Sequence, residues 1–379
     1  MKASGMRDEN PDFLEYVYKR LWMAAGAGEE HADAVARAVS LGDRMGKLTQ
    51  GMGVLDVIFL SLESGNMDME ATPEIVAEGP SWVVYDGKQS TGHWTLTLAA
   101  EKAIEKARDQ AIAIAMARNH NDAGSFYAYT SLAVEQDMFA MATNNSVPLV
   151  SPWGGMENRL SGAPFCAACP GGEEFPLVCD VACIEAHDGN ISEAAYNNEK
   201  LKGRFLVNPE TGELTDDPAP WIIPVEGYGR ICGCSAPTVF DTPRLYAFNV
   251  FTEMLATLIV PDSVITPELP HGVDAWKEPW GMGSVGGSAI IVIDPSHFGH
   301  IDEVMARSDR FIREVKATKN LPGVDEIFLP GERGYRNQAD KKPVKILETH
   351  WQPFLQRLHK YGLDIDGLRR DWSDIGGEN

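Results

Sequence analysis

The segment from residue 111 to residue 145 constrains the fold more than any other part of the chain. AIAIAMARNH is apolar enough to be a buried strand, SFYAYTSLAVEQD has the pattern of a short helix, and MFAMATNN predicts the next strand. The polar turn between the first strand and the helix is therefore expected at the C-terminal end of a strand and before a helix N-terminus. Binding and catalytic sites are often built at such a place.

Helices and further strands are predicted on both sides of this segment. Residues 10–64 carry apolar side chains at helical spacing, with Asp12 as a candidate N-cap, and Pro243 lies in the first turn of a later apolar helix. Residues 208–243 are expected to form a long loop. Helices are predicted in TGHWTLTLAAEKAIEKARDQ, DTPRLYAFNVFTEMLATLIV, HIDEVMARSDRFIREVKAT and ILETHWQPFLQRLHKYG, strands in PEIVAEG, SWVVYDG, FCAACP, PLVCDVACIEAHDG and AIIVIDP, and a C-terminal loop in LPGERGYR.

These elements predict a mixed α/β fold in two parts. Residues 1–75 would form a helical N-terminal part that packs with the C-terminal helices of residues 300–379, and residues 76–299 would form a mixed α/β part that carries the site. No G-x-G-x-x-G follows a first strand, so the usual Rossmann fingerprint is absent. The sequence also lacks a P-loop, a G-x-S-x-G and an H-E-x-x-H motif.

The charge balance narrows the possible partners. The chain of 379 residues has a formal net charge of −22, which repels nucleic acids and anionic membranes. An anionic substrate would need local cations or helix N-termini. No apolar run is long enough to span a bilayer, and MKASGMRDENPDF has no apolar signal core. We therefore expect a cytoplasmic protein with a small-molecule partner.

Six cysteines fall in three close pairs, which in a cytoplasmic chain raises the question of a metal site. Two of the pairs lie in the apolar runs PFCAACP and FPLVCDVACI, and the ligand spacing of zinc ribbons is absent. Free cysteines that serve as small buried apolar residues are the expected outcome, with no bound metal. The cysteines are Cys166, Cys169, Cys179, Cys183, Cys232 and Cys234.

Several segments, in order along nearly the whole chain, resemble the malate/L-lactate dehydrogenase type 2 family. The family's Asn-Ser-x-His-Phe-Gly turn is similar to NHNDAG at 119–124, and its proline–glycine loop is similar to NSVPLVSPWGG at 145–155. Its Asp-x-Ala strand is similar to DVA at 180–182, and its late Pro-Gly-Glu is present at 330–332. Together, the order and the spacing of these motifs make the resemblance specific.

The resemblance implies the family's non-Rossmann, mixed-sheet α/β fold and its chemistry. The chain would be an NAD(P)-dependent oxidoreductase that acts on a small 2-oxo, 2-hydroxy or cyclic imino acid, with NAD or NADP as the cofactor. It would be a homodimer whose active site lies near the subunit interface. The residues carried over as cofactor-binding are Ser146, Asp180, Val181, Ala182, Arg244, Pro330, Gly331 and Glu332.

Polar residues of the family's site are replaced in this chain. The family's Ser-His-Gly is TQG at 49–51, the substrate-binding arginine that follows it aligns with Val54, and the histidine of the central turn aligns with Asp122. The glutamine in TQG can donate and accept hydrogen bonds but cannot titrate. Arg44 and Lys47 lie nearby in sequence and could hold an anion. The replaced anion-binding residues predict that the substrate is not an ordinary 2-oxo dicarboxylate.

The candidate catalytic residues are His120, Asp122 and Gln50, and the candidate substrate-binding residues are Thr49 and Arg44. An imidazole titrates near neutral pH and transfers protons readily. The Asp122 carboxyl can donate a proton only if burial raises its pKa. The structural alternatives are a polar turn residue for His120 and a helix cap for Asp122. If the two act together, both should line the main cleft, close to Gln50 and Arg244.

Two other functions stay open at this point, because a fold does not fix a function. One is a non-redox lyase or isomerase on the same scaffold, in which His120 and Asp122 abstract a proton. The other is a catalytically silent homologue with a binding role. Binding of a nicotinamide cofactor separates the oxidoreductase from both alternatives.

Overall fold

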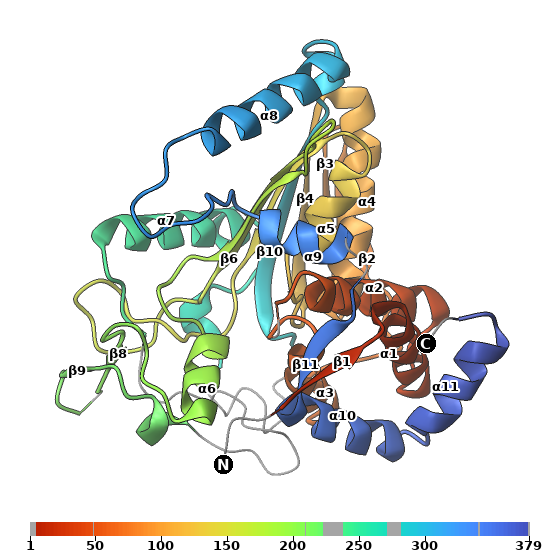
Figure 1. Cartoon of the computed structure of the whole chain (residues 1–379), viewed down its shortest axis with the longest axis vertical. Coiled ribbons are helices and arrows are strands. Elements are labelled where there is room, and N and C mark those ends of the chain that lie inside the picture. Colours follow the sequence, from red (N-terminus) through yellow and green to blue (C-terminus); the bar gives the residue numbers. More distant parts are fainter. Residues whose placement is uncertain are drawn as a thin grey trace.

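A seven-stranded mixed sheet forms the centre of the molecule (Figure 1). The structure, a computed structural model, describes residues 5–47, 49–208, 210–222, 238–270, 282–339 and 342–377. Within this sheet β3 and β4 are parallel, and the other neighbouring pairs are antiparallel. The strands, in spatial order, are β2 (Glu74–Gly79), β3 (Trp82–Asp86), β4 (Ile112–His120), β10 (Val285–Ile293), β5 (Phe139–Asn144), β6 (Pro164–Cys169) and β7 (Leu177–Ala182).

Helices cover both faces of this sheet. α4 (Gly92–Gln110) and α5 (Tyr127–Val134) pack on one face, while α7 (Pro243–Glu253) and the π-helical turn Met254–Leu258 lie on the other (Figure 1). The core under α4 and α5 is rich in alanine from both the helix and the strands. Small side chains allow close approach of helix and sheet, so the apolar contact is dense although few side chains are large. The N-cap of α4, Thr91, accepts a hydrogen bond from Trp94 N at 3.1 Å.

The N-terminal helices share a second apolar core with the C-terminal end of the chain. In Figure 1 the red and dark blue segments lie side by side. The elements involved are β1 (Met6–Glu9), α1 (Pro11–Ala24), α2 (Glu29–Arg44), α3 (Leu55–Glu63), β11 (Val344–Leu347), α10 (Glu348–Lys360) and α11 (Ile365–Asp374). A partly buried ion pair at 2.9 Å joins Arg357 of α10 to Asp56 of α3.

The helix α8 (Ile301–Lys316) packs elsewhere, beside the turn that joins β6 to β7. Asp309 on this helix accepts hydrogen bonds from the backbone N–H groups of Gly172, Glu173 and Glu174 at 2.8 to 3.1 Å. The C-terminal region therefore contacts two parts of the molecule. The expected division into residues 1–75 with 300–379 and residues 76–299 stays a prediction.

Most expected elements are present, with shifts at their ends. Asn10, not Asp12, is the N-cap of α1, because its side chain accepts from Asp12 N and Phe13 N. The segment LPGERGYR, expected as a loop, contains the start of α9 (Glu332–Ala339). The expected long loop, residues 208–243, contains the short strand β9 (Leu214–Thr215), which pairs with β8 (Leu206–Val207) just before the loop. Residues 223–237 lie outside the described part. The sequence reading also missed α6 (Asp188–Asn197).

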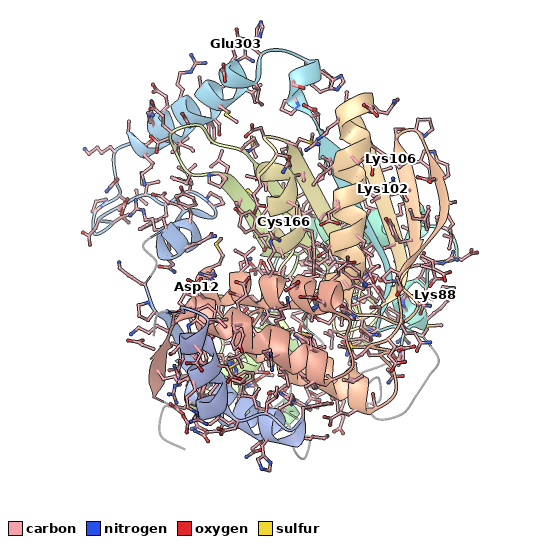
Figure 2. The ribbon with its side chains drawn as sticks, turned by 90° about the vertical axis from the view of Figure 1, so that its right-hand side faces the viewer. Asp12, Lys88, Lys102, Lys106, Cys166 and Glu303 are labelled. Atoms are coloured by element: carbon pink, nitrogen blue, oxygen red, sulfur yellow. The ribbon has the colours of Figure 1, made fainter. Side chains whose placement is uncertain are left out.

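The four described cysteines are free thiols. Cys166 and Cys183 are buried as expected, and Figure 2 shows Cys166 in the interior, where its Sγ lies 3.2 Å from Thr130 Oγ1. Cys179 differs from the expectation because it lies exposed on the edge strand β7. In the described residues no group of three or more histidines, cysteines and acids is placed to hold a metal ion. Cys232, Cys234 and His271 lie outside that part.

No helix in the described ranges is long and apolar enough to cross a bilayer.

Three buried histidines lie around the N-terminal end of α4. His31 Nε2 is 2.8 Å from Thr91 Oγ1, and His120 Nε2 is 2.7 Å from Ser288 Oγ. Neither ring nitrogen of His93 has a hydrogen-bond partner within the described part of the chain. Burial lowers the pKa of His31 and His120 to about 4 and that of His93 to about 3. All three side chains are therefore neutral at pH 7.

We predict that acid destabilises the fold through these histidines. Their folded-state pKa values lie below the usual 6.5, so the unfolded chain binds protons that the folded chain does not. The stabilisation is complete above pH 6.5 and is lost as the pH falls towards about 4. One pKa unit corresponds to about 1.4 kcal/mol, so urea unfolding should show a loss of several kcal/mol over this range.

The variant His93→Leu should weaken this pH dependence, because it removes a buried group that must otherwise stay neutral. The matched control is His359→Leu, since His359 is exposed. Equal pH dependence of the free energy of unfolding in both variants would contradict the assignment.

Candidate active site

Asp180, close to the C-terminal end of the edge strand β7, collects three donors from distant parts of the chain. Its Oδ2 accepts a hydrogen bond from Ser125 Oγ at 2.7 Å and one from Tyr127 N at 3.3 Å. Lys47 forms an ion pair with the same oxygen. The Asp180 side chain is 8% exposed, whereas that of Lys47 is 29% exposed. The carboxylate therefore joins α2, α5 and the edge of the sheet at one point, with the lysine reaching solvent.

The turn that follows α2 and carries Lys47 is held by a buried carboxyl group. Asp43 Oδ1 accepts from Met52 N at 2.9 Å, and Asp43 Oδ2 accepts from Tyr18 Oη at 2.6 Å. Burial raises the pKa of Asp43 to about 6. A Cβ at Gly42 would lie 2.4 Å from the backbone oxygen of Gln50, so glycine allows the turn to fold back against its own helix.

The loop at Pro330 and Gly331 closes the site from the other side. Pro330 O accepts from Val178 N at 3.3 Å, which docks the loop on the edge strand β7. Gly331 has a φ of 85°, and a Cβ there would lie 2.7 Å from Val178 Cβ and 3.1 Å from Val178 N. Only glycine meets both the backbone conformation and the close approach without strain. α9 begins at the next residue.

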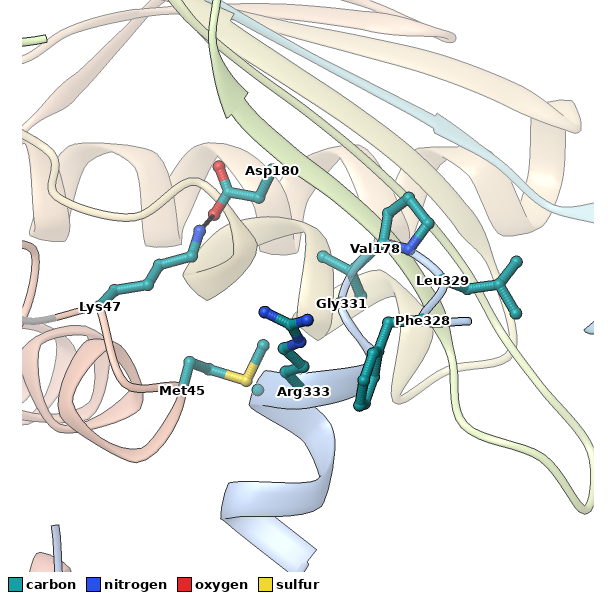
Figure 3. Close-up of a pocket in the computed structure, with 10 residues that line it drawn as sticks. Met45, Lys47, Val178, Asp180, Phe328, Leu329, Gly331 and Arg333 are labelled. Carbon is teal, nitrogen blue, oxygen red and sulfur yellow. Dashed lines mark hydrogen bonds and ion pairs between the residues drawn. The ribbon is translucent and has the colours of Figure 1, made fainter. Parts of the chain in front are cut away.

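A cavity of about 470 Å³ lies between this loop and the turn after α2. Figure 3 shows Lys47 reaching Asp180 on one side and Arg333 projecting from the first turn of α9 on the other. Two cations thus line a cavity in a chain of net charge −22. Lys47 is paired with Asp180 on the same wall, whereas Arg333 has no carboxylate partner among the described residues. The lining residues are Met45, Lys47, Val178, Asp180, Phe328, Leu329, Pro330, Gly331, Arg333 and Gly334.

Two of the replaced family positions lie on the turn after α2. Gln50 N donates to Lys47 O at 2.8 Å. The side-chain Oε1 of Gln50 is buried, and no described residue donates to it. Thr49 packs against the start of α6, since a Cβ at Gly189 would lie 2.5 Å from Thr49 Cγ2. The turn therefore carries an acceptor that a bound donor group would satisfy.

Asp122 lies in the turn between β4 and α5 that also carries Ser125. Its Oδ1 accepts from Gly124 N at 2.9 Å, and the side chain is partly exposed. Burial raises the pKa of Asp122. Burial therefore shifts this carboxyl group in the direction that favours proton donation. It also spans the turn as an Asx-type cap, so the structural alternative describes part of its role.

His120 differs from the expected placement. Its side chain is fully buried against the sheet and lines neither described cavity. Nδ1 donates to Asn121 O and Nε2 accepts from Ser288 Oγ, both at 2.7 Å, in the neutral tautomer that this pairing requires. Asn119 has a φ of 52°, a left-handed conformation that asparagine tolerates. This residue breaks the in–out alternation of β4 and turns the following imidazole towards α4.

Other expected site residues are dispersed. Arg44 pairs with Asp12 at 2.6 Å and with Glu15 at 3.2 Å, away from the cavity. Glu332 is buried, pairs with Lys316 and Arg336, and accepts from Leu329 N at 3.1 Å. It therefore holds the loop rather than facing the cavity. Asp122 and Gln50, expected in the main cleft, do not line the cavity either. The other expected residues outside its lining are Thr49, Ser146, Val181, Ala182 and Arg244.

Sequence reasoning missed three residues at or beside the cavity: Ser125, Arg333 and His187. His187 caps α6, where its Nδ1 accepts from Gly189 N at 3.0 Å. Burial and then the nearby Lys47 charge lower the pKa of His187. Ser125 and Arg333 directly follow or flank the family motifs, which was a usable signal. His187 carried none, because it meets Lys47 only in the folded chain.

A second cavity of about 290 Å³ lies at the C-terminal ends of β3 and β4, beside Asp86 and Arg118. Arg118 there pairs with Asp86 at 3.4 Å and with Asp262 at 2.6 Å. Both of its carboxylate partners lie on the cavity wall. This arginine is thus neutralised by the protein, and the larger cavity has the more available positive charge.

The larger cavity fits the nicotinamide cofactor that the resemblance implies. Lys47 and Arg333 can attract phosphates. Gln50 is not part of the cavity lining, although it lies on the turn after α2 that carries Lys47 and its Oε1 has no donor among the described residues. Because Gly331 has no side chain, the loop backbone can approach Val178 closely. The cavity thus supplies the positive charge that the phosphates of a dinucleotide need.

We predict that Gly331→Ala destabilises the protein more than Gly323→Ala does. Both glycines have positive φ, 85° and 83°, but a Cβ at Gly323 meets nothing within 4 Å. The control should cost about 1 kcal/mol through backbone strain alone, and Gly331→Ala about 3 kcal/mol because it also forces the loop off β7. Chemical denaturation measures both values. Equal losses would mean that the docking of the loop is not tight.

Comparison with known proteins agrees with this architecture. The family model described as malate/L-lactate dehydrogenase matches residues 10–353. Malate dehydrogenase of Pyrococcus horikoshii is 25% identical, over 97% of this chain and 100% of its own. L-sulfolactate dehydrogenase of Methanocaldococcus jannaschii is 27% identical, over 90% of this chain and 93% of its own. The crystal structure of malate dehydrogenase from Entamoeba histolytica, 20% identical, superposes with a TM-score of 0.85 over 95% of this chain and 99% of that one. The chain therefore belongs to the malate/L-lactate dehydrogenase family of oxidoreductases.

Proposed function

We propose that this protein is an NAD(P)-dependent dehydrogenase or reductase whose cofactor lies in the cavity between Lys47 and Arg333. Its substrate is a small 2-oxo or 2-hydroxy acid, or a related cyclic imino acid. One observation carries the proposal: residues far apart in sequence, Asp180 with Pro330 and Gly331, meet on one cavity wall beside two cations. The malate and sulfolactate dehydrogenases similar to this chain support the same reaction class.

The protein's part in this reaction is to bind, orient and exchange a proton. A nicotinamide, when bound, supplies or accepts a hydride at its ring C4. Lys47, fixed by Asp180, attracts an anionic group while it remains 29% exposed. Gln50 Oε1, which has no donor among the described residues, could accept a hydrogen bond from a bound group. These groups reduce the freedom of the reactants before the chemical step, which lowers its entropic barrier.

We propose that Asp122 donates the proton that the reduction requires. A carbonyl oxygen that receives a hydride at its carbon becomes an alkoxide and needs a proton. Burial raises the pKa of Asp122, so its carboxyl group keeps a proton to a higher pH than an exposed aspartate does. His120 is paired on both ring nitrogens inside the sheet. We therefore assign the proton-transfer role, which the sequence divided between the two residues, to Asp122.

Cofactor binding tests the function directly. NADH or NADPH should show enhanced nicotinamide fluorescence and should raise the melting temperature when added to the protein. Binding to the folded state stabilises it in proportion to the logarithm of the cofactor concentration. If neither cofactor binds at millimolar concentration, the oxidoreductase proposal fails, and the lyase, isomerase and silent-homologue alternatives return.

We predict that Asp122→Asn lowers turnover by about two to four orders of magnitude. The amide oxygen can still accept from Gly124 N, so the fold and the cofactor affinity should change little. The readout is kcat for whichever member of a panel of 2-oxo and cyclic imino acids the wild type reduces. Reduction by the wild type should also decline with rising pH as Asp122 loses its proton. Near-normal turnover of Asp122→Asn would leave this carboxyl group with only its capping role.

We further propose that the protein is a homodimer that uses the outer face of α7 and of the π-helical turn that follows it. Several apolar side chains there are exposed, and exposed apolar patches of this kind often mark interfaces. Light scattering should give twice the chain mass of 41.5 kDa at micromolar concentration, and a monomer mass would refute the proposal. The exposed side chains are Phe248, Phe251, Met254, Leu258 and Ile259.

A further inference from the structure

We propose that Arg333, stacked on Phe328, makes the protein prefer NADP(H) over NAD(H) by binding the 2′-phosphate of the adenosine ribose. The inference rests on the proposed function, because it assumes that the larger cavity holds the cofactor. It goes further by choosing between two cofactors that differ only in this phosphate group.

Three cations surround the ring of Phe328, and they differ in their counter-charges. Arg333 lies 4.3 Å from the ring centroid, Arg336 lies 5.2 Å away and Lys316 lies 5.6 Å away. Lys316 and Arg336 each pair with both Glu326 and Glu332. Arg333 has no carboxylate partner in the described ranges. It is also the member of this trio that lines the cavity (Figure 3).

The acid on the described cavity wall is already paired with a lysine. Sites that prefer NAD commonly bind the ribose hydroxyls with an aspartate or glutamate. Among the described lining residues Asp180 is the one carboxylate. It already accepts from Ser125 and Tyr127 and pairs with Lys47. The wall therefore offers one guanidinium without a carboxylate partner among the described residues, whereas the charge of its one carboxylate is offset by Lys47.

The chemistry of Arg333 suits a phosphate monoester better than the pyrophosphate common to both cofactors. A monoester carries between one and a half and two negative charges at neutral pH, whereas each phosphorus of the pyrophosphate bridge carries about one. A guanidinium presents a planar pair of donors to two phosphate oxygens. The stack on Phe328 fixes the plane of this fork and reduces the rotational freedom lost on binding.

The experiment compares two pairs of probes that differ by the 2′-phosphate. NADPH and NADH are titrated by fluorescence, and adenosine 2′,5′-bisphosphate and adenosine 5′-monophosphate are titrated by calorimetry. The proteins are the wild type, Arg333→Gln, Arg333→Lys and the matched control Arg336→Gln, which alters a cation on the same ring outside the cavity lining. Thermal unfolding verifies that each variant is folded.

The wild type should bind NADPH about 10- to 100-fold more tightly than NADH, as expected for a charge-assisted bidentate contact. Arg333→Gln should remove most of this preference by weakening NADPH and the bisphosphate, with NADH and the monophosphate within about twofold. Arg333→Lys should retain part of it, and Arg336→Gln most of it.

Equal weakening of both members of each pair in Arg333→Gln would assign Arg333 to the shared part of the cofactor and overturn the inference, while the proposed function would stand. An unchanged preference in Arg333→Gln, or a wild type that prefers NADH, would overturn it as well. Failure of both NADPH and NADH to bind the wild type would refute the proposed function, and the inference with it.

Discussion

The Asp180 carboxylate is the contact on which the arrangement of the candidate site depends. One oxygen receives Ser125 Oγ at 2.7 Å and Tyr127 N at 3.3 Å and pairs with Lys47. These donors come from α5 and from the turn after α2, and β7 supplies the acceptor. A carboxylate with 8% exposure is stable only when such donors surround it. Because the buried carboxylate needs these hydrogen-bond donors, it holds the three segments together.

A second buried carboxyl group fixes the turn from which Lys47 extends. Asp43 accepts hydrogen bonds from Tyr18 Oη and Met52 N. The glycines at 42 and 51 allow the turn after α2 to pass close to the helix. The Pro330–Gly331 loop then docks on the same edge strand from the opposite side. Each of these contacts joins residues distant in sequence. The cavity is thus a product of tertiary structure, and no single motif encodes it.

The sequence predicted the scaffold well because hydrophobic periodicity and motif order report local structure. The strands expected at 111–120, 138–145 and 289–295 are present as β4, β5 and β10 with shifted ends, and the flanking helices are present too. It failed at His120 because the left-handed Asn119 reverses the strand alternation, which residue type alone does not reveal. It also paired Arg44 with Lys47 as an anion clamp, although Arg44 binds Asp12 and Glu15. The sequence did not single out Arg333, because its contact with Phe328 and the ion pairs of the neighbouring cations are visible only in the folded structure.

The central claim is that the cofactor occupies the cavity between the turn after α2 and the start of α9. Hydrogen exchange of backbone amides with saturating NADPH, compared with the free protein, tests it most directly, because it maps contact without requiring a substrate. The account predicts added protection in peptides covering residues 45–47, 177–182 and 328–334, with little change in α10 and α11. Protection confined to residues 118–119 and 282–286, around the second cavity, would contradict it.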